Sequence, residues 1–510
     1  IFLKPLVLVS SIYALLTLAY LYPLILNFRG LAGHGDAWQF VWNFWWVDRV
    51  LATPNLSLFY TNFLHWPQGI SLILQTMTLA NTLPAVLLSN VFDFIITYNL
   101  LVILHFILSG IGMYLLCYHF SKNHFASFIG GFLFAFSPYR FVHYYGHLHL
   151  LTTEVLPFAI LFLVRTFEGK RWSWIGAAIF CALTAYADLY YFLFLFIVSA
   201  ALTLWYRPRT RQVLGKLCLI VIFTAIAILP YLGPLVQATQ SNPDFQVLGH
   251  DSIQNSNDAK SFFIPGGRSA FRSLTSWYWN HWPAWRETGS YVGYAVIVLL
   301  LWGLWKARSK QYWFWAILGL IFAILSLGPH LQIGGRIITS FELPYGWIER
   351  QFSMLKLAGV PARFFVITSL SLAILVSLAL SKQRKFVAAI FLVVLAFEYL
   401  PAPVEVSAVI ASPFYETLRS DPEQYAIIDI SDVPAKVLYY QTIHERSLIG
   451  GYTTRPTAST DKFLAETNFK DKKTLQSLQV RYVLVPPGVE YAKGLDEVYS
   501  DRFLTAYRVY

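Results

Sequence analysis

The segment HGDAWQFVWNFWW, residues 34–46, follows the first long apolar run of the chain and sets our interpretation of the fold. Its acidic residue, Asp36, comes where an apolar helix over residues 6–28 would leave a bilayer. On a helical wheel Asp36, Gln39 and Asn43 share one face, and the tryptophans lie on the opposite face. Indoles prefer the headgroup layer, so we expect a helix in the membrane interface with its Trp face embedded. An ionisable residue placed there is a candidate functional residue, and the plainer alternative is that Asp36 only caps the helix.

The composition indicates an all-α polytopic membrane protein. Hydrophobic residues make up 56% of the 510 residues and charged residues only 13%, whereas soluble proteins carry about a quarter charged residues. The net charge of +11 is dispersed in short clusters between apolar runs, which is typical of cytoplasmic anchoring and not of nucleic-acid binding. All three cysteines lie in or beside apolar runs, so no disulfide framework is predicted.

The apolar runs predict about 11–13 transmembrane helices. Clear spans are expected at 6–28, 100–120, 150–164, 214–235, 291–304, 314–327, 364–380 and 386–399, with a short one at 125–136 and two within 172–206 that are broken near Asp188. We read the first run as a retained span and not as a cleaved signal peptide.

Basic clusters give the expected orientation. Clusters around Arg165, Arg209, Arg308 and Lys385 fall at alternate turns, and the positive-inside rule makes these turns cytoplasmic. The long loops then lie outside the cell, provided that residues 72–94 are a re-entrant or tilted segment. The alternative topology places the histidines of residues 137–154 in the cytoplasm.

The sequence predicts two domains. Residues 1–400 form the transmembrane domain, with a first outer loop at 28–75 and a large outer loop at 236–290 that we expect to be an ordered cap. Residues 401–510 change to ordinary globular composition and predict a small extracytoplasmic α/β domain. Strands are expected at 425–430 and 480–486, and helices at 460–470 and 473–478.

A second candidate segment, residues 137–154, concentrates polar side chains: Tyr139, Arg140, His143, His147, His149 and Glu154. A pair of histidines four residues apart on a helix can bind a metal ion. Gly146 interrupts the helix, and no acidic residue accompanies the pair in a metal-binding motif. The pattern therefore favours a wet polar groove that binds a hydroxyl-rich ligand or a phosphate over a zinc site, and ordinary interfacial histidines are the alternative.

A third segment, residues 350–365, brings Arg350, Lys356 and Arg363 to the outer end of a span without an acidic residue in the segment. The guanidinium fork suits bidentate phosphate binding, which a low dielectric strengthens. Snorkelling to lipid headgroups is the plainer explanation.

This order of elements resembles the GT-C superfamily of integral membrane glycosyltransferases, and in particular its YfhO-like and protein-mannosyltransferase-like bacterial members. The likeness covers roughly residues 6–400 and rests on GDAWQFVWNFWW, WPQGISL, FSPYRFVHYYGHLHLL and VPARFF. The chain departs from the commonest family pattern, a carboxylate pair in the first loop, because Gly35 and Ala37 flank Asp36.

The resemblance implies an inverting transferase of the cytoplasmic membrane with an extracytoplasmic site. Its donor would be a polyprenyl-phosphate sugar, and its acceptor a glycan, lipid or protein. Asp36 would be the general base, or would hold the acceptor through a divalent cation such as Mg²⁺ or Mn²⁺. Arg363, with Lys356, would bind the donor phosphate. The further candidate substrate-binding residues are His34, Gln39, Asn43, His65, Tyr139, Arg140, His143, His147, His149 and Glu154.

Two other classes of protein stay open. A flippase or transporter of lipid-linked saccharides would also be polytopic, basic and lined with polar groups, although internal repeats, which such proteins usually carry, are not found here. A non-catalytic protein of envelope assembly is favoured only if Asp36 is dispensable.

Overall fold

A computed structural model describes residues 3–241, 250–283, 286–306, 309–352, 355, 359–455, 458–491 and 494–510. The chain divides into two compact units. The first comprises Ile1–Leu26, Leu100–Leu229 and Gly249–Val404, and the second Asn27–Asn99, Pro230–Leu248 and Glu405–Tyr510. The change of composition near residue 400 therefore coincides with a boundary between units, but the first loop belongs to the same unit as the C-terminal domain.

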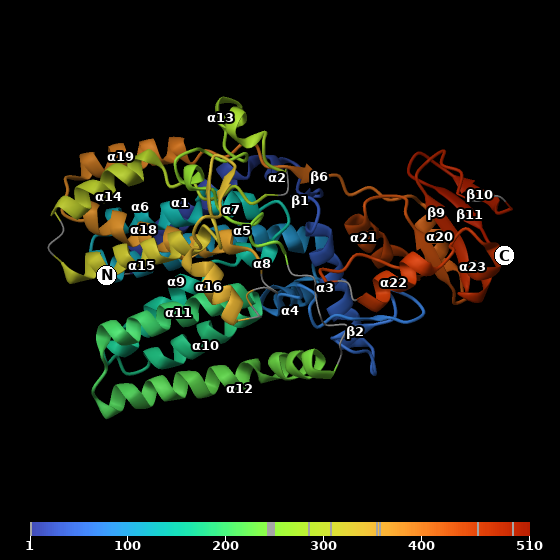
Figure 1. The fold of residues 1–510 in the computed structure, drawn as a ribbon, viewed down its shortest axis with the longest axis horizontal. Coiled ribbons are helices and arrows are strands. Elements are labelled where there is room, and N and C mark those ends of the chain that lie inside the picture. The colour runs from blue at the N-terminus through green and yellow to red at the C-terminus, as the bar shows by residue number, and fades with distance from the viewer. Residues whose placement is uncertain are drawn as a thin grey trace. The chain divides into compact units, whose positions relative to one another are not determined.

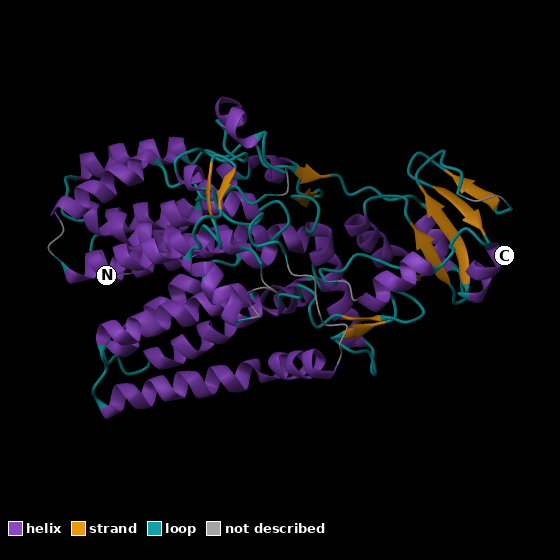
Figure 2. Cartoon of the chain, viewed as in Figure 1, coloured by secondary structure: helices purple, strands orange, loops and turns teal. Residues whose placement is uncertain are grey.

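The first unit is helical (Figures 1 and 2). Its helices are α1 (Leu3–Tyr20), α2 (Tyr22–Leu26), α5 (Phe94–Ser121), α6 (His124–Ala135), α7 (Pro138–His143), α8 (Leu148–Leu151), α9 (Val155–Phe167), α10 (Ser173–Ala187), α11 (Leu189–Tyr206), α12 (Arg211–Ser241), α13 (Arg272–Trp279), α14 (Tyr294–Lys306), α15 (Lys310–Ser326), α16 (Pro344–Gln351), α18 (Phe365–Leu380) and α19 (Lys385–Glu398). The unit boundaries fall within α5 and α12, and most residues of both helices belong to the first unit. Two 3₁₀ turns, Ala259–Phe262 and Pro361–Phe364, and a hairpin of β4 (Leu331–Ile333) and β5 (Arg336–Ile338) complete it.

Helix α18 forms the centre of this unit. It is apolar on every side, as expected of a helix that is buried all round, and it packs against α6, α14 and α15. Gly319 of α15 allows the close approach, because a Cβ atom there would lie 2.9 Å from the Cβ of Ser371. Thr368 Oγ1 donates a hydrogen bond to the Gly319 carbonyl at 3.1 Å. Small and hydroxyl residues at such contacts are typical of helix packing in membranes.

The expectation of an all-helical membrane fold is confirmed. Among the described residues, five helices are long and apolar enough to cross a membrane: Phe94–Ser121, His124–His143, Leu189–Tyr206, Arg211–Ala238 and Pro361–Leu380. Six shorter apolar helices accompany them. The predicted break near Asp188 is present, where Asp188 ends α10 and accepts a hydrogen bond from the Tyr191 N–H at 3.1 Å to cap α11.

The second unit holds the α/β domain that the sequence predicts. Its five-stranded sheet has the order β10-β11-β9-β7-β8; β7 pairs in parallel with β8 and β9, and the β9–β11 and β11–β10 pairs are antiparallel (Figure 2). The strands are β1 (Leu31–Ala32), β2 (Tyr60–Thr61), β3 (Ile70–Ser71), β6 (Val406–Ser407), β7 (Ala426–Asp429), β8 (Ser447–Leu448), β9 (Val480–Val485), β10 (Asp496–Ser500) and β11 (Thr505–Arg508). The helices are α3 (Ala37–Ala52), α4 (Leu79–Leu88), α20 (Phe414–Ser420), α21 (Pro434–His444), α22 (Ala458–Glu466) and α23 (Lys472–Ser477).

The predicted helix after Asp36 is α3, but its Trp face is not embedded in a membrane interface. Trp42 and Trp46 are fully buried, and their rings stack 5.7 Å apart. They join one hydrophobic core with side chains of α20, α21 and the sheet, where Trp42 Nε1 donates to Gln441 Oε1 at 2.8 Å. The expectation was wrong because residues 405–510 supply both an apolar surface and a hydrogen-bond acceptor for the indole rings. Without this domain, the tryptophans would have had to find such an environment in the headgroup layer.

Candidate functional site

In the first unit, Arg363 forms an ion pair with Glu287. Its Nε and Nη2 donate to Glu287 Oε1 at 3.0 and 2.8 Å, and its guanidinium lies over the ring of Tyr190 at 4.9 Å. Both charged side chains are about nine-tenths buried. Arg363 has no acidic neighbour in the local sequence, but the structure supplies a counter-ion from 76 residues away.

The same Glu287 brings two of the predicted histidines into this cluster. His143 Nε2 lies 3.7 Å from Glu287 Oε2, and the Nδ1 atoms of His143 and His147 are 3.1 Å apart. Gly289 allows the loop of Glu287 to reach α7, since a Cβ at Gly289 would lie 2.7 Å from Tyr139 Cα. We call Arg363, Glu287, His143 and His147 the arginine–histidine cluster.

The charges inside the cluster explain why Glu287 is ionised. Burial alone would raise the pKa of Glu287, but the positive charge of Arg363 and the neighbouring histidines, with the hydrogen bond from Arg363, lower it to about 2. Glu287 is thus a carboxylate at neutral pH and forms an ion pair with the charged Arg363.

A second acid, Asp188, lies beside the cluster. Its Oδ2 is 3.8 Å from His149 Nε2. Burial raises the pKa of Asp188 to about 6, although Arg363 opposes the shift. Burial also lowers the pKa of His149, and the charge of Arg363 adds to this effect. His149 is therefore neutral at physiological pH.

The remaining predicted residues of segment 137–154 do not line a wet groove. Arg140 is 1% exposed, donates to Ser109 Oγ and Thr153 Oγ1, and lies over the ring of Phe106. Glu154 is 6% exposed and is hydrogen-bonded to His105 Nδ1 at 2.6 Å. That part of the expectation was wrong, because helix α5 supplies buried partners for both groups, and burial without partners would be costly.

Tyr139 is also buried, and its hydroxyl lies 3.2 Å from that of Tyr191. Lys356 lies outside the described residues.

In the second unit, Asp36 is held by Tyr452. The Tyr452 hydroxyl donates to Asp36 Oδ1 at 2.6 Å. Asp36 makes no side-chain cap of α3, so the capping interpretation is not supported. Burial, then the charge of Asp36 and the hydrogen bond to it, raise the pKa of Tyr452, which keeps this hydroxyl protonated as a donor.

Asp36 opens onto a pocket of about 600 Å³. The pocket lies between the start of α3 and the start of α21, and His34, Trp38, Ser407, Lys436 and Tyr452 line it with Asp36. Lys436 pairs with Asp432 at 2.9 Å and brings a positive charge to the wall. A carboxylate, a cation and an aromatic ring around one pocket suit a polar, hydroxyl-bearing ligand.

The polar face predicted for α3 is confirmed. Gln39 Nε2 donates to Thr454 Oγ1 at 2.9 Å, and Asn43 Nδ2 donates to the Thr76 carbonyl at 2.8 Å. Both side chains are buried and do not line the pocket. Gln39 holds the segment that carries Tyr452, whereas Asn43 holds Gln75 and Thr76, and Gln75 in turn accepts a hydrogen bond from the Thr454 N–H.

Two predicted histidines of the second unit differ in exposure. His34 lies 3.4 Å from Glu405 and is about half exposed at the pocket. His65 is 3% exposed and does not line it. Burial lowers the pKa of His65, so His65 is a neutral side chain of the interior.

A divalent cation finds a better donor set at the cluster than at Asp36. His143, His147 and Glu287 offer ligand atoms within 4.8 Å of one another, and among the described residues no other trio of His, Cys, Asp or Glu does so. Two imidazoles and a carboxylate suit Zn²⁺. Sequence reasoning missed Glu287 and Tyr452, since no short-range motif marks either.

The architecture is that of the GT-C membrane glycosyltransferases. The arabinofuranosyltransferase AftD from Mycobacteria is similar over 99% of this chain and 41% of its own, at a TM-score of 0.63 and 12% identity. ArnT from Cupriavidus metallidurans, whose structure was solved bound to undecaprenyl phosphate, is similar over 100% of this chain and 98% of its own, at a TM-score of 0.52 and 10% identity. At these identities the likeness concerns the fold, and it confirms the GT-C-like fold that the sequence predicts.

The chain spans less than half the length of the arabinofuranosyltransferase. No curated protein sequence matches it. The chain belongs to the family described as Domain of unknown function (DUF6311), whose model matches residues 10–397.

Proposed function

We propose that this membrane protein transfers a sugar from a polyprenyl-phosphate donor to an acceptor hydroxyl at the extracytoplasmic face, with inversion at the anomeric carbon. The observation that carries the proposal is the carboxylate of Asp36, fixed by Tyr452 in a pocket of about 600 Å³ on a GT-C fold. The undecaprenyl phosphate bound to ArnT supports the class of donor.

Asp36 acts as the general base. It accepts the proton of the acceptor hydroxyl while that oxygen attacks the anomeric carbon, and the bond between this carbon and the donor phosphate oxygen breaks. The products are the glycosylated acceptor and the polyprenyl phosphate. Tyr452 is a positioning residue, because its hydrogen bond fixes the carboxylate before the substrate arrives.

Arg363 is the candidate for binding the donor phosphate. Glu287 engages its Nε and Nη2 through one carboxylate oxygen, which leaves Nη1 as the donor for a phosphate oxygen. Fixed positive charge stabilises a phosphate leaving group. Lys356 stays a second candidate for binding the phosphate. The acceptor, whether glycan, lipid or protein, would meet the pocket of Asp36.

The test is sugar transfer in proteoliposomes with radiolabelled polyprenyl-phosphate sugars. Asp36→Asn should lower transfer by about 10²- to 10⁴-fold, whereas Asp48→Asn on the same helix should leave it unchanged. Arg363→Ala should also lower transfer, with Arg350→Ala as its control, because Arg350 is exposed and pairs with Glu342. Undiminished transfer by Asp36→Asn would contradict the mechanism.

A second function, movement of a lipid-linked saccharide across the bilayer, is favoured by the buried ionisable groups of the first unit. Arg363, Glu287, Asp188 and the histidines beside them are the kind of groups that mark ion and substrate pathways in membrane proteins. Transbilayer movement of a fluorescent lipid-linked sugar without transfer in the same proteoliposomes would support this function over the transferase.

A further inference from the structure

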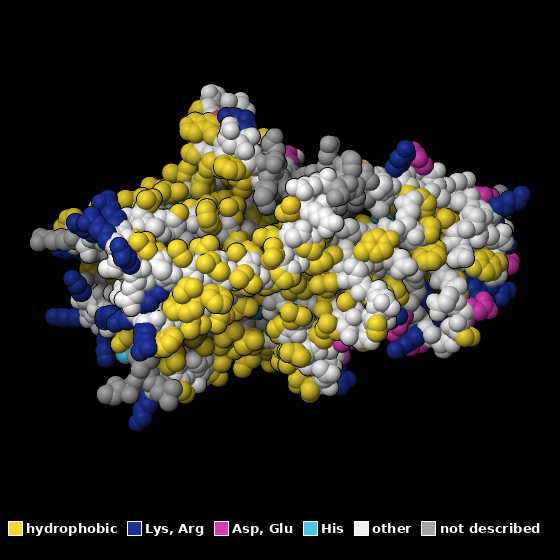
Figure 3. All heavy atoms as spheres, turned by 90° about the horizontal axis from the view of Figure 1, so that it is seen from below, with side chains coloured by type: hydrophobic (Ala, Val, Ile, Leu, Met, Phe, Trp, Pro, Cys, Tyr) yellow, Lys and Arg dark blue, Asp and Glu magenta, His cyan; other side chains and the backbone are white. Residues whose placement is uncertain are grey.

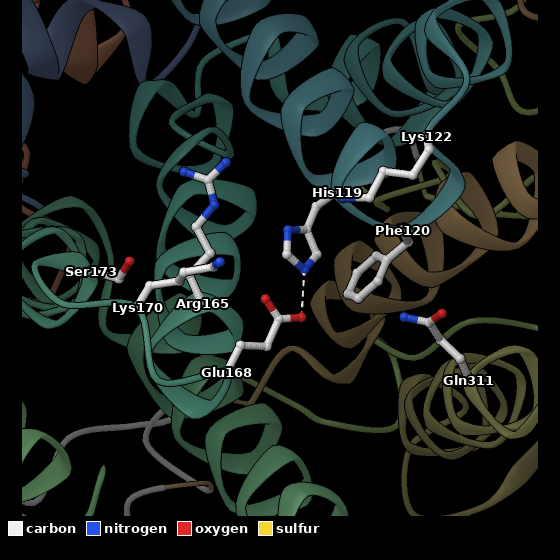
Figure 4. Close-up of a pocket in the computed structure, with 8 residues that line it drawn as sticks. All are labelled: His119, Phe120, Lys122, Arg165, Glu168, Lys170, Ser173 and Gln311. Atoms are coloured by element: carbon white, nitrogen blue, oxygen red, sulfur yellow. Dashed lines mark hydrogen bonds and ion pairs between the residues drawn. The ribbon is translucent and has the colours of Figure 1, made fainter. Parts of the chain in front are cut away.

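A pocket of about 550 Å³ lies in the first unit, apart from the arginine–histidine cluster. It is formed by the end of α5, the end of α9, the start of α10 and the start of α15. Figure 4 shows the His119 ring and the Glu168 carboxylate meeting in the middle, with Phe120 and Gln311 on one side and Arg165, Lys170 and Ser173 on the other.

The lining of this pocket is positively charged. Three basic side chains, Lys122, Arg165 and Lys170, and one carboxylate, Glu168, line it, and His119 Nε2 lies 2.9 Å from Glu168 Oε1. Three cations against one anion leave an excess of positive charge. Glu168 offsets one of the three cations, so the lining keeps a net positive charge.

The turn that carries Lys170 is held in place. Lys216 Nζ of α12 donates to the carbonyl oxygens of Gly169 and Lys170, both at 3.1 Å, and the Lys170 N–H donates to the Arg165 carbonyl at 3.0 Å. Lys170 and Arg165 are therefore presented from an ordered turn, which lowers the entropy lost when they bind an anion.

The end of an apolar helix puts the pocket at the level expected for lipid headgroups. The candidate span of α5 ends at Ser121, so His119 and Lys122 fall at the end of the apolar stretch. Figure 3 shows Lys and Arg side chains gathered at one end of the helical unit, at the left of the view, next to a surface that is mainly hydrophobic. By the positive-inside rule this end is cytoplasmic.

We propose that this pocket binds the phosphate headgroup of an anionic phospholipid from the cytoplasmic leaflet. Arg165 suits a phosphate through its planar fork, and Lys122 and Lys170 add point charges. The Ser173 hydroxyl adds a polar group, and Phe120 offers an apolar wall for the glycerol end of the acyl chains. Basic pockets between helices on this side of a membrane recognise such headgroups. The assignment does not depend on the proposed sugar transfer.

The experiment counts bound lipid by native mass spectrometry, after the purified protein is exchanged into micelles with phosphatidylglycerol or phosphatidylcholine. The variant Arg165→Gln with Lys170→Gln removes two charges from the pocket. The control Lys382→Gln with Arg384→Gln removes two exposed charges from the turn between α18 and α19. Inorganic phosphate is titrated against the lipid-free protein, with the melting temperature as readout.

The wild-type protein should retain phosphatidylglycerol in preference to phosphatidylcholine. Each charge removed should weaken retention about fivefold, hence about 25-fold for the pocket variant, and the control should bind as the wild type does. Equal losses in both double variants, or equal retention of the two lipids, would overturn the proposal. Stabilisation by inorganic phosphate without retention of phosphatidylglycerol would assign the pocket to a soluble anion instead. Should the double variant not fold, Lys122→Gln gives the same readout.

Discussion

The phenolic oxygen of Tyr452 lies 2.6 Å from Oδ1 of Asp36, although 416 residues separate the two in the sequence. Both belong to the second compact unit, in which α3 packs against α21. The C-terminal domain thus supplies a hydrogen bond to the carboxylate that the sequence singles out. This relationship gives that domain a direct part in fixing the candidate base.

Replacement of Tyr452 by Phe should lower the rate of sugar transfer about tenfold. Hydrogen bonds to charged groups contribute about 1.5–3 kcal/mol, and loss of this one leaves Asp36 less well oriented. The measurement is the turnover number in proteoliposomes. Tyr499→Phe is the matched control, because it removes a Tyr–Asp hydrogen bond to Asp501 elsewhere in the same unit. Equal losses in the two variants would indicate a general effect on folding and not a role at Asp36.

Replacement of Glu287 by Gln should destabilise the first unit by about 3 kcal/mol at neutral pH, because Arg363 is left buried without a counter-charge. The folded-state pKa of about 2 lies below the ordinary 4.5. The ion pair therefore stabilises the protein above pH 4.5, and this stability is lost as pH falls toward 2. Thermal unfolding in detergent checks both statements, since wild type and variant should converge at low pH.

The control for that experiment is Glu342→Gln, which breaks the exposed pair with Arg350. Exposed pairs contribute at most about 1 kcal/mol. A loss as large as that of Glu287→Gln would show that burial does not set the difference.

Replacement of Asp188 by Asn should raise the unfolding free energy relative to that of the wild type, and this gain should be larger at pH 7 than at pH 4. The pKa of Asp188 is about 6 in the fold against 3.8 ordinarily, so the folded state holds the proton more tightly. Stability attributable to this group falls as pH rises from 3.8 to about 6. The variant lacks the charge, and Asn can still cap α11. The difference in unfolding free energy between variant and wild type should therefore grow by about 3 kcal/mol over this range; a constant difference would contradict the assignment.

The trio His143, His147 and Glu287 should bind one Zn²⁺ per chain. Wild-type protein equilibrated with Zn²⁺ and then dialysed should retain it by elemental analysis, and the double variant His143→Gln with His147→Gln should not. His330→Gln, a histidine outside the trio, is the control. Absence of retained zinc in the wild type would leave the trio as a hydrogen-bonded network only.

The sequence by itself determined the class of fold and the ends of many elements. Long apolar runs with few charges predict helices in a bilayer, because a helix satisfies its backbone hydrogen bonds within its own segment. The break at Asp188 and the strands of the C-terminal domain followed from local patterns that short segments carry. The sequence also placed Asp36, Gln39 and Asn43 on one helical face, because helical periodicity is local.

Tertiary structure alone decided the partners of those residues. The tryptophans of α3 are core and not membrane anchors because α21 covers them, and Arg363 has a counter-ion because the loop of Glu287 returns to the start of α18. The sequence pattern indicated Arg140 and Glu154 as ligand-binding residues. In the structure Arg140 donates to Ser109 of α5 and to Thr153, and Glu154 is hydrogen-bonded to His105 of α5. Charge and hydrogen-bond pairing act over a few ångströms in space regardless of separation along the chain, so no spacing rule in the sequence reveals them.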